Sequence, residues 1–323
     1  MPELFGCARE ILALLPTPLH QAPRLSAELG IPVWFKRDDL TGLGLGGNKL
    51  RPLEFLLGYA LERGCDVLIT GSGPQSNWSM LAALAARRCG LDVVVCFYGD
   101  PPEETRGNLK LQRLTGADLR WTGDPSRTSV DVMIDQVAED LRKEGRRPFV
   151  VPRGGATSRG SLGYLNAAIE IAAQTSALGI ADAQLWLATG SCGTQAGLVT
   201  GVAAGYLPRV TGVTVSRSAE ECDRRVLELA AGAAELAATA MPTPSMVNII
   251  DGFIGPGYGY TSPEGEAAAD LVLRTEGLFL DPPFCAKGMA ALIDAARDGR
   301  IHGPVIFLVS GGAPTLFVQD GAL

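Results

Sequence analysis

The first candidate for chemistry is a glycine-rich turn that ends in a lysine. Residues 42–49 are GLGLGGNK, and a helical pattern begins near residue 50. The adjacent glycines permit positive φ angles and a close backbone approach to a ligand. Lys49 would stand at the positive end of a helix dipole, which disfavours the protonated amine and favours the free amine that forms a Schiff base. Taken alone, the motif is better explained by a capped helix with an exposed lysine than by a lysine that forms a Schiff base.

A second turn, residues 71–77 (GSGPQSN), follows one strand pattern and opens a helical pattern. It brings Gln75, Ser76 and Asn77 to the carboxyl end of a parallel strand, where open α/β sheets bind ligands. Uncapped amides and these side chains would suit a carboxylate. A cluster that caps the helix without any ligand also explains them.

A third turn, residues 189–197 (TGSCGTQAG), again lies between a strand pattern and a helical pattern. Backbone amides and the hydroxyls of Ser191 and Thr194 could cradle a phosphate on the helix dipole. No GK[ST] follows, and the GxGxxG spacing is absent. The phosphate would therefore belong to something other than ATP or NAD. The residues of this predicted cradle are Gly190, Ser191, Cys192, Gly193 and Thr194.

Composition narrows the classes of function. The chain has 323 residues, 46% of them hydrophobic, and a net charge of -7, so we expect a globular protein that binds neither nucleic acid nor membrane. Seven cysteines without CxxC spacing accompany only His20 and His302, so we predict no metal site and no histidine-based triad. A signal peptide and a membrane-spanning run are not evident, and we expect a cytoplasmic protein with reduced thiols.

Alternation of short apolar runs with amphipathic stretches predicts an α/β protein with parallel sheets flanked by helices. No repeat and no Gly/Ser-rich or Pro-rich hinge is present, so a second domain would be interleaved with the first. The predicted strands are residues 33–36, 66–70, 92–97, 118–121, 148–151, 184–188, 209–215 and 304–309. The predicted helices are residues 50–63, 75–89, 104–115, 130–144, 162–178, 194–206, 219–238, 262–276 and 286–298.

One lysine, one phosphate cradle and one site sized for a carboxylate together match the needs of pyridoxal phosphate and an amino acid. With further motifs, the chain resembles the fold-type II pyridoxal phosphate enzymes, in the group of D-cysteine desulfhydrase and 1-aminocyclopropane-1-carboxylate deaminase. These motifs run in family order over almost the whole chain. They are LPTPL (15–19), FKRDD (35–39), GGNK (46–49), QSN (75–77), GS and GTQAG (190–197), GVTVSR (212–217), PGYG (256–259), LDP (280–282) and GGAP (311–314).

The resemblance implies a two-domain fold like that of the tryptophan synthase β chain. A small domain at 51–160 would be inserted into a large cofactor-binding domain at 1–50 and 161–323. It implies that Lys49 binds the cofactor covalently, that Asn77 donates to the ring hydroxyl oxygen and that residues 190–194 hold the phosphate. Ser310 would lie beside the pyridine nitrogen. As a neutral partner it would leave the ring a weaker electron sink, suited to elimination.

The resemblance also implies a substrate side of the site and a homodimer. Ser76 and the amides around Gln75 would hold the carboxylate of a small amino acid, with Asn77 and Trp78 beside it. Trp78 could equally wall the pocket or turn into the core. Tyr258 and Phe284 complete the expected catalytic positions.

Two departures from the family pattern bear on activity. Phe284 and Cys285 stand where the family commonly has Tyr-Thr or Tyr-Glu, so the tyrosine hydroxyl implicated in cyclopropane ring opening and a carboxylate for the pyridine nitrogen are both missing. Deaminase activity on the cyclopropane substrate is thereby put in doubt. Cys192 replaces a glycine in the phosphate turn, and we expect it to be a small buried thiol rather than a redox group.

The function predicted is α,β-elimination and deamination of a small amino acid with a β leaving group, with D-cysteine desulfhydration as the nearest model. The alternatives are 1-aminocyclopropane-1-carboxylate deamination, sulfonate elimination from cysteate, and β-replacement or racemisation. A non-enzyme alternative is a weakened homologue that binds pyridoxal phosphate or an amino acid, although retention of Lys49 argues against it. A nucleotide-phosphate enzyme using residues 190–194 is disfavoured by the missing nucleotide motifs.

Overall fold

Two β-sheets form the framework of the chain. The structure, a computed structural model, describes residues 2–318. The larger sheet has the strand order β11-β10-β9-β12-β4-β3; β3 runs antiparallel to β4, and the other pairs are parallel. Its strands are β3 (Leu19–Gln21), β4 (Val33–Arg37), β9 (Gln184–Thr189), β10 (Val210–Thr214), β11 (Ile249–Ile250) and β12 (Val305–Val309).

The smaller sheet is built from chain that lies between β4 and β9. Its order is β7-β6-β5-β8, and all its pairs are parallel. Val67 and Ile69 of β5 pack on the same side as the α5 residues Val130 and Ile134, whereas Leu68 packs with α2 and α3. Burial on both faces explains why this strand is a continuous apolar run. The strands are β5 (Val67–Ser72), β6 (Asp92–Phe97), β7 (Asp118–Trp121) and β8 (Pro148–Val150).

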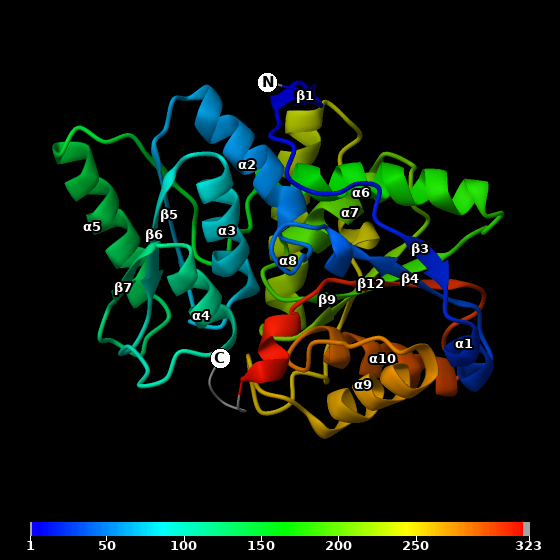
Figure 1. Cartoon of the computed structure of the whole chain (residues 1–323). Helices are drawn as coiled ribbons and strands as arrows, with labels where there is room; N and C mark the ends of the chain where they lie inside the picture. Colours follow the sequence, from blue (N-terminus) through cyan, green and yellow to red (C-terminus); the bar gives the residue numbers. More distant parts are fainter. Residues whose placement is uncertain (1, 319–323) are drawn as a thin grey trace.

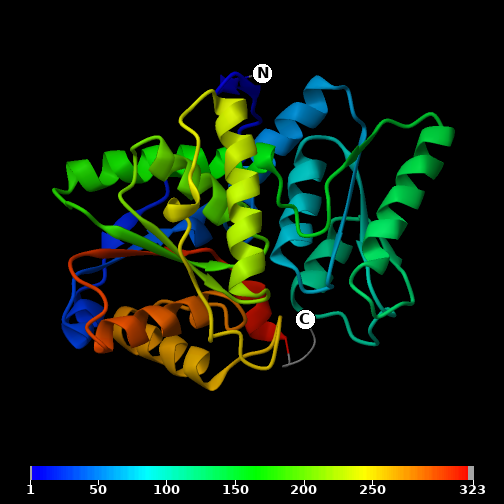
Figure 2. The same cartoon turned by 180° about the vertical axis from the view of Figure 1, so that it is seen from behind.

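Helices cover both faces of each sheet (Figures 1 and 2). On the large sheet, α1, α9 and α10 pack around Phe35 and Phe307, and α6, α7 and α8 pack on the opposite face around Leu185 and Leu308. The helices are α1 (Pro23–Leu29), α2 (Leu50–Glu62), α3 (Asn77–Arg88), α4 (Gly107–Leu114), α5 (Ser129–Lys143), α6 (Ser158–Ala177), α7 (Gly193–Ala203), α8 (Ala219–Ala237), α9 (Pro263–Glu276) and α10 (Cys285–Arg297).

The predicted α/β class is confirmed, and each predicted strand and helix has a counterpart. The sequence does not predict α1, which spans only two turns, nor the short strands β1 (Glu3–Leu4), β2 (Cys7–Ala8), β3 and β11. Strands of two or three residues are too short to show an alternating pattern. The helix predicted from residue 162 begins at Ser158, where the Thr157 side chain accepts from the Gly160 amide at 3.0 Å. The domain limits at 51 and 160 stay a prediction.

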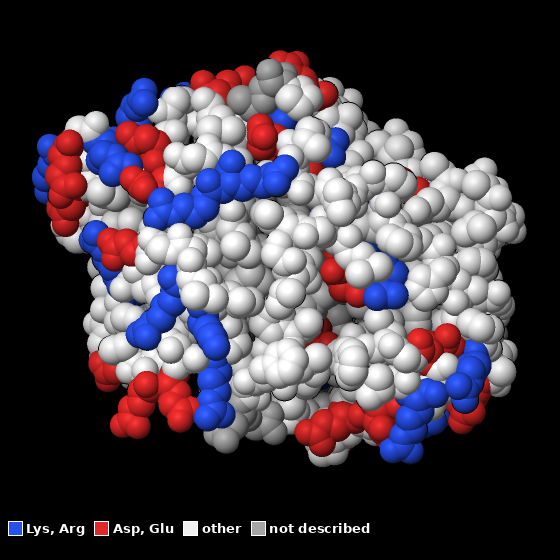
Figure 3. Space-filling model, in the orientation of Figure 1, with Lys and Arg blue, Asp and Glu red and all other residues white. Residues whose placement is uncertain are grey.

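Charges of both signs are interspersed on the face shown in Figure 3. Within residues 2–318, no helix combines the length and apolar character needed to cross a membrane. In the same range, no three His, Cys, Asp or Glu side chains gather as a metal site requires. All seven cysteines are free thiols.

A buried ion cluster joins the first turn of α2 to the large sheet. Arg51 is fully buried and donates to both carboxylate oxygens of Asp38 at 2.8 Å and to Glu170 at 2.9 and 3.0 Å. Lys36 also donates to Glu170, and the Tyr164 hydroxyl donates to Asp38 at 2.5 Å. Burial works to raise the pKa of Asp38, but Arg51 beside it holds that pKa below its ordinary value.

A second buried carboxyl group lies at the start of α10. Asp281 Oδ1 accepts from the Cys285 amide at 3.1 Å. Its Oδ2 atom is buried and has no hydrogen-bond partner among the described residues. Burial raises the pKa of Asp281 to about 6.

We expect Arg51→Met to lower the free energy of unfolding by about 3–5 kcal/mol, because Asp38 and Glu170 would stay buried without their shared counter-charge. Chemical denaturation measures this change. The control is Arg224→Met on the exposed surface of α8, where the arginine pairs only with Glu228 across one helical turn, and we expect a change below about 0.5 kcal/mol. Equal losses in the two variants would contradict the prediction.

Replacing Asp281 should change how stability depends on pH. Below about pH 4 the folded and unfolded forms both carry the proton; between about pH 4 and 6 the folded form retains it longer, so ionisation costs the folded state about 3 kcal/mol by neutral pH. Asp281→Asn removes this cost. Denaturation curves of the cofactor-free protein should show the variant gaining stability over wild type as pH rises through this window. A difference that is constant with pH would refute the assignment.

Candidate active site

A cavity at the carboxyl ends of β9, β10 and β12 brings most of the predicted site residues together. It lies between the two sheets, with the start of α3 on its small-sheet side. The predicted residues that line it are Lys49, Ser76, Asn77, Trp78, Gly190, Ser191, Tyr258, Phe284 and Ser310. A smaller adjoining cavity, at the start of α7, is lined by Lys49, Gly193 and Thr194 among others. Neither lining includes Gln75 or Cys192.

Lys49 is positioned by a turn that only glycine can form. Gly46 has a φ of 71°, and a Cβ atom there would lie 2.0 Å from the carbonyl oxygen of Asp39. Gly47 exchanges two hydrogen bonds with the Thr41 hydroxyl, at 2.8 and 2.9 Å. Lys49 occupies the N-cap position of α2, and burial lowers the pKa of its amine to about 8. The sequence analysis expected the helix dipole to lower this pKa, whereas desolvation is the main cause.

Asn48 ties the lysine turn to two other parts of the cavity. Its amide donates to the carbonyl oxygen of Ser310 at 2.9 Å, and its Nδ2 atom donates to the Thr194 hydroxyl at 3.1 Å. Asn48 lies within the GGNK motif, but its residue type and position alone indicate no role for it. The structure shows that it fixes the lysine relative to the start of α7.

The predicted phosphate turn has the geometry of an anion site. Cys192 caps α7 with a φ of 76°, a left-handed conformation that glycine adopts more readily than other residues. The first turn of α7 contains no acidic side chain, and its leading amides have no acceptor within the helix. The Ser161 hydroxyl accepts no hydrogen bond from these amides. It donates instead to the carbonyl oxygen of Gly193 at 3.0 Å. The Cys192 side chain is buried, as expected.

The three polar residues at the start of α3, Gln75, Ser76 and Asn77, make different contacts. Ser76 is the N-cap, and its hydroxyl oxygen accepts from the Trp78 amide at 3.2 Å. Gln75 turns away from the cavity and bonds to the backbone of Arg106 and Asn108 at the start of α4. The Asn77 oxygen accepts from Asn108 Nδ2 at 2.7 Å, which directs its amide nitrogen elsewhere. Asn108 is a positioning residue that the sequence analysis missed.

Trp78 is both a core residue and a wall. Its side chain is 2% exposed, and its Nε1 atom donates to the Thr70 hydroxyl at 2.9 Å. A Cβ atom on Gly155 would lie 2.2 Å from the indole, so the glycine backbone packs directly against the ring. The two alternatives drawn from the sequence are therefore compatible.

Aromatic side chains close the opposite wall. The rings of Tyr258 and Phe284 are 5.6 Å apart, and the guanidinium of Arg127 lies 4.4 Å from the Tyr258 ring. Burial raises the pKa of Tyr258 to about 12, so its phenol stays protonated at neutral pH. Phe284 contributes an apolar surface at the position where a phenol was expected in relatives.

The Ser310 hydroxyl contacts a thiol instead of a carboxylate. It lies 3.0 Å from Cys285 Sγ, which also accepts from the Ser310 amide at 3.3 Å. Asp281, whose unpartnered oxygen was described above, contacts Cys285 from the other side. The LDP motif containing Asp281 was recognised in the sequence, but no signal there indicated that its carboxyl group is buried beside the site.

Lys287 is the other lysine near this region, and it has a structural role. It is fully buried, and its amine donates to the carbonyl oxygens of Ile254 at 2.6 Å and Gly257 at 3.1 Å. Lys287 thus holds the segment that carries Tyr258. It does not line the cavity, which leaves Lys49 as the lysine of the described site.

Comparisons with known proteins agree with this geometry. A family model described as "Pyridoxal-phosphate dependent enzyme" matches residues 11–311. The chain is 39% identical over 312 residues to the D-cysteine desulfhydrase of Salmonella choleraesuis (strain SC-B67), covering 94% of this chain and 93% of that protein. It is 38% identical over 309 residues to a "Putative 1-aminocyclopropane-1-carboxylate deaminase" of Pyrococcus abyssi (strain GE5 / Orsay), covering 95% and 92%.

Solved structures resemble the chain along nearly its whole length. An ACC deaminase homologue superimposes with a TM-score of 0.89 at 35% identity and covers 96% of this chain and 94% of its own. A threonine deaminase from T.th. has a TM-score of 0.67 at 20% identity, covers 92% of both chains, and shares the fold. With this architecture and the family match over most of its length, the chain belongs to the pyridoxal-phosphate dependent enzymes of fold type II.

Proposed function

We propose that the chain eliminates a β substituent from a small amino acid and deaminates the product, releasing a keto acid and ammonia, as D-cysteine desulfhydrase-like enzymes would. The observation that carries this proposal is the placement of Lys49. It lines both the cavity that contains Asn77 and Ser310 and the adjoining cavity at the start of α7. The side chain of Lys49 therefore borders both the space proposed for the cofactor ring and the space proposed for its phosphate.

The residues present fit pyridoxal 5'-phosphate. Ser191, Thr194 and the leading amides of α7 are donors suited to a phosphate. Asn77 has its oxygen engaged by Asn108, so its amide nitrogen is available to donate to a ring oxygen. Ser310 offers a neutral hydroxyl to the pyridine nitrogen. When bound, the cofactor supplies an aldehyde that joins an amine and a ring that accepts electrons from the α carbon.

The side chains that line the cavity would transfer the α proton, bind the substrate carboxylate and exclude water. Lys49 Nζ would take the α proton of the substrate, and its pKa of about 8 leaves part of the amine unprotonated near neutral pH. Ser76 accepts from Trp78, so its own hydroxyl proton is left to donate to the substrate carboxylate. The rings of Trp78, Tyr258 and Phe284 would keep bulk water from the reacting carbon.

A homodimer in the cytoplasm is part of the same proposal; the dimer rests on the family resemblance, and the location rests on the sequence pattern described above. Sedimentation or light scattering of the purified protein tests the dimer.

Lys49→Ala should abolish the borohydride-sensitive visible absorption of the bound cofactor and turnover of D- and L-amino acids with β leaving groups, because the covalent anchor and the base are one atom. Absorption spectra and assays of keto acid and ammonia measure these effects. Lys143→Ala, on the exposed end of α5, is the control and should retain both signals. A reducible band in Lys49→Ala would move the role to another lysine and contradict the assignment.

Wild-type protein should be a poor deaminase of 1-aminocyclopropane-1-carboxylate, because Phe284 offers no hydroxyl beside Tyr258. Phe284→Tyr supplies that group, and we expect it to raise kcat/KM for this substrate by at least about 10-fold, within the range of general acid–base effects. Phe284→Leu is the control and should give no gain. Rapid ring opening by the wild type would show that Tyr258 or another group already performs this step.

A further inference from the structure

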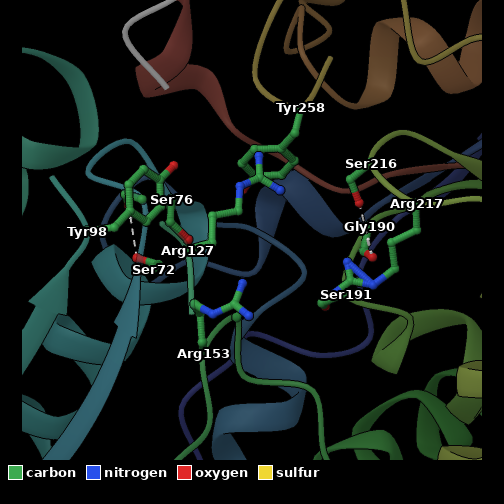
Figure 4. A pocket seen from close by; sticks show the side chains of 12 residues that line it. Ser72, Ser76, Tyr98, Arg127, Arg153, Gly190, Ser191, Ser216, Arg217 and Tyr258 are labelled. Atoms are coloured by element: carbon green, nitrogen blue, oxygen red, sulfur yellow. Dashed lines mark hydrogen bonds between the residues drawn. The ribbon is translucent and has the colours of Figure 1, made fainter. Parts of the chain in front are cut away.

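Three arginines line a third cavity, whose lining also includes Tyr258. Arg127 comes from the loop between β7 and α5, Arg153 follows β8, and Arg217 follows β10. Figure 4 shows Arg127 and Arg153 on one side of this cavity, with Arg217 across from them and Tyr258 above. We call this the arginine cavity. Two of its cations belong to the small-sheet side and one to the large-sheet side.

The arginine cavity shares a wall with the Lys49 cavity. Ser76, Gly190, Ser191 and Tyr258 line both. Lys49 and the α7 residues that line the adjoining phosphate cavity do not line the arginine cavity. A group held by the arginines would therefore lie beside the place proposed for the cofactor phosphate, because Gly154 and Ser191 line all three cavities whereas Gly193 and Thr194 line only the phosphate cavity.

Charge in the arginine cavity is one-sided. No acidic residue is among the described residues that line it, although the whole chain carries a net charge of -7. Arg153 pairs with Asp131 at 3.2 Å and Arg217 with Glu221 at 2.9 Å, and both carboxylates lie outside the lining and about half exposed. Among the described residues, Arg127 contacts the Tyr258 ring and has no carboxylate partner. Arg127 is exposed and Arg153 and Arg217 are partly buried, so three guanidinium groups meet in a cavity whose lining holds no acid. Such a set of donors is suited to bind an oxyanion.

We propose that the arginine cavity binds a second anionic group of the substrate, a sulfonate or phosphate carried on the β carbon. This inference rests on the proposed elimination and names its substrate class. A tetrahedral oxyanion presents several acceptor atoms, which matches donors that approach from opposite sides. The phenols of Tyr98 and Tyr258 add neutral donors to the same cavity.

The chemistry balances without a further reactant other than water. Removal of the α proton is followed by breakage of the bond from the β carbon to sulfur or oxygen, and the leaving group departs with the electron pair as sulfite or phosphate. One water molecule then replaces the amino nitrogen, giving pyruvate and ammonia. The arginines would stabilise the charge of the departing anion, so their effect should appear in kcat/KM for anionic substrates.

The test uses the holoenzyme with both enantiomers of cysteine, cysteate, O-phosphoserine and β-chloroalanine. Sulfite release and phosphate release distinguish the two anionic substrates, and β-chloroalanine supplies a leaving group that is neutral before elimination. We expect turnover of at least one anionic substrate. In Arg153→Met and Arg217→Met, its kcat/KM should fall about 10- to 100-fold more than that of β-chloroalanine. Arg224→Met on α8 is the charge-matched control and should change neither value.

Each other outcome overturns the inference in a recognisable way. If β-chloroalanine is turned over and neither anionic substrate is, the arginine cavity has another use while the proposed elimination stands. Equal losses for anionic and neutral substrates would place the α carboxylate at these arginines. Absence of turnover with every substrate, including D-cysteine, would instead reject the proposed function. The visible spectrum and Tm of each variant identify folding defects, and Arg153→Lys, which keeps the charge, should recover part of the loss.

Discussion

The first turn of α2, which directly follows Lys49, depends on the buried ion pair between Arg51 and Asp38. Arg51 lies two residues after Lys49 and binds Asp38, which follows β4, and Glu170 of α6. Buried charges of this kind stabilise a fold only when every partner is present, because each one alone would bear the full cost of desolvation. The cluster therefore specifies one geometry for the first turn of α2 and is not simply a source of additional stability.

The turns of the candidate site could be predicted from sequence because each one is formed by residues that are contiguous in the chain. Each turn follows a strand and precedes a helix, as Gly46 and Gly47 do before α2 and the glycine-rich turn does before α7. This pattern can be recognised without knowing the fold. The partners that fix the side chains could not be predicted. Asn108 is 31 residues from Asn77, and Glu170 is 119 residues from Arg51, so only the folded chain brings them together.

Two cysteines that depart from the expected motifs have defined settings in the structure. Cys192 adopts a left-handed backbone conformation at the start of α7. Cys285 contacts both Ser310 and Asp281. The 20% identical threonine deaminase shares the fold, so the architecture tolerates extensive change of sequence.

The chain enters the small sheet through α2 and leaves it just before α6, and both crossings border the cavity. The first is held to the large sheet by Arg51, whereas the second contains Gly154 and Gly155, both with a φ of 77°. The two connections therefore differ in kind. Buried charge fixes the first, whereas the second lacks side chains at two successive residues, and one of them, Gly154, lines both the Lys49 cavity and the arginine cavity.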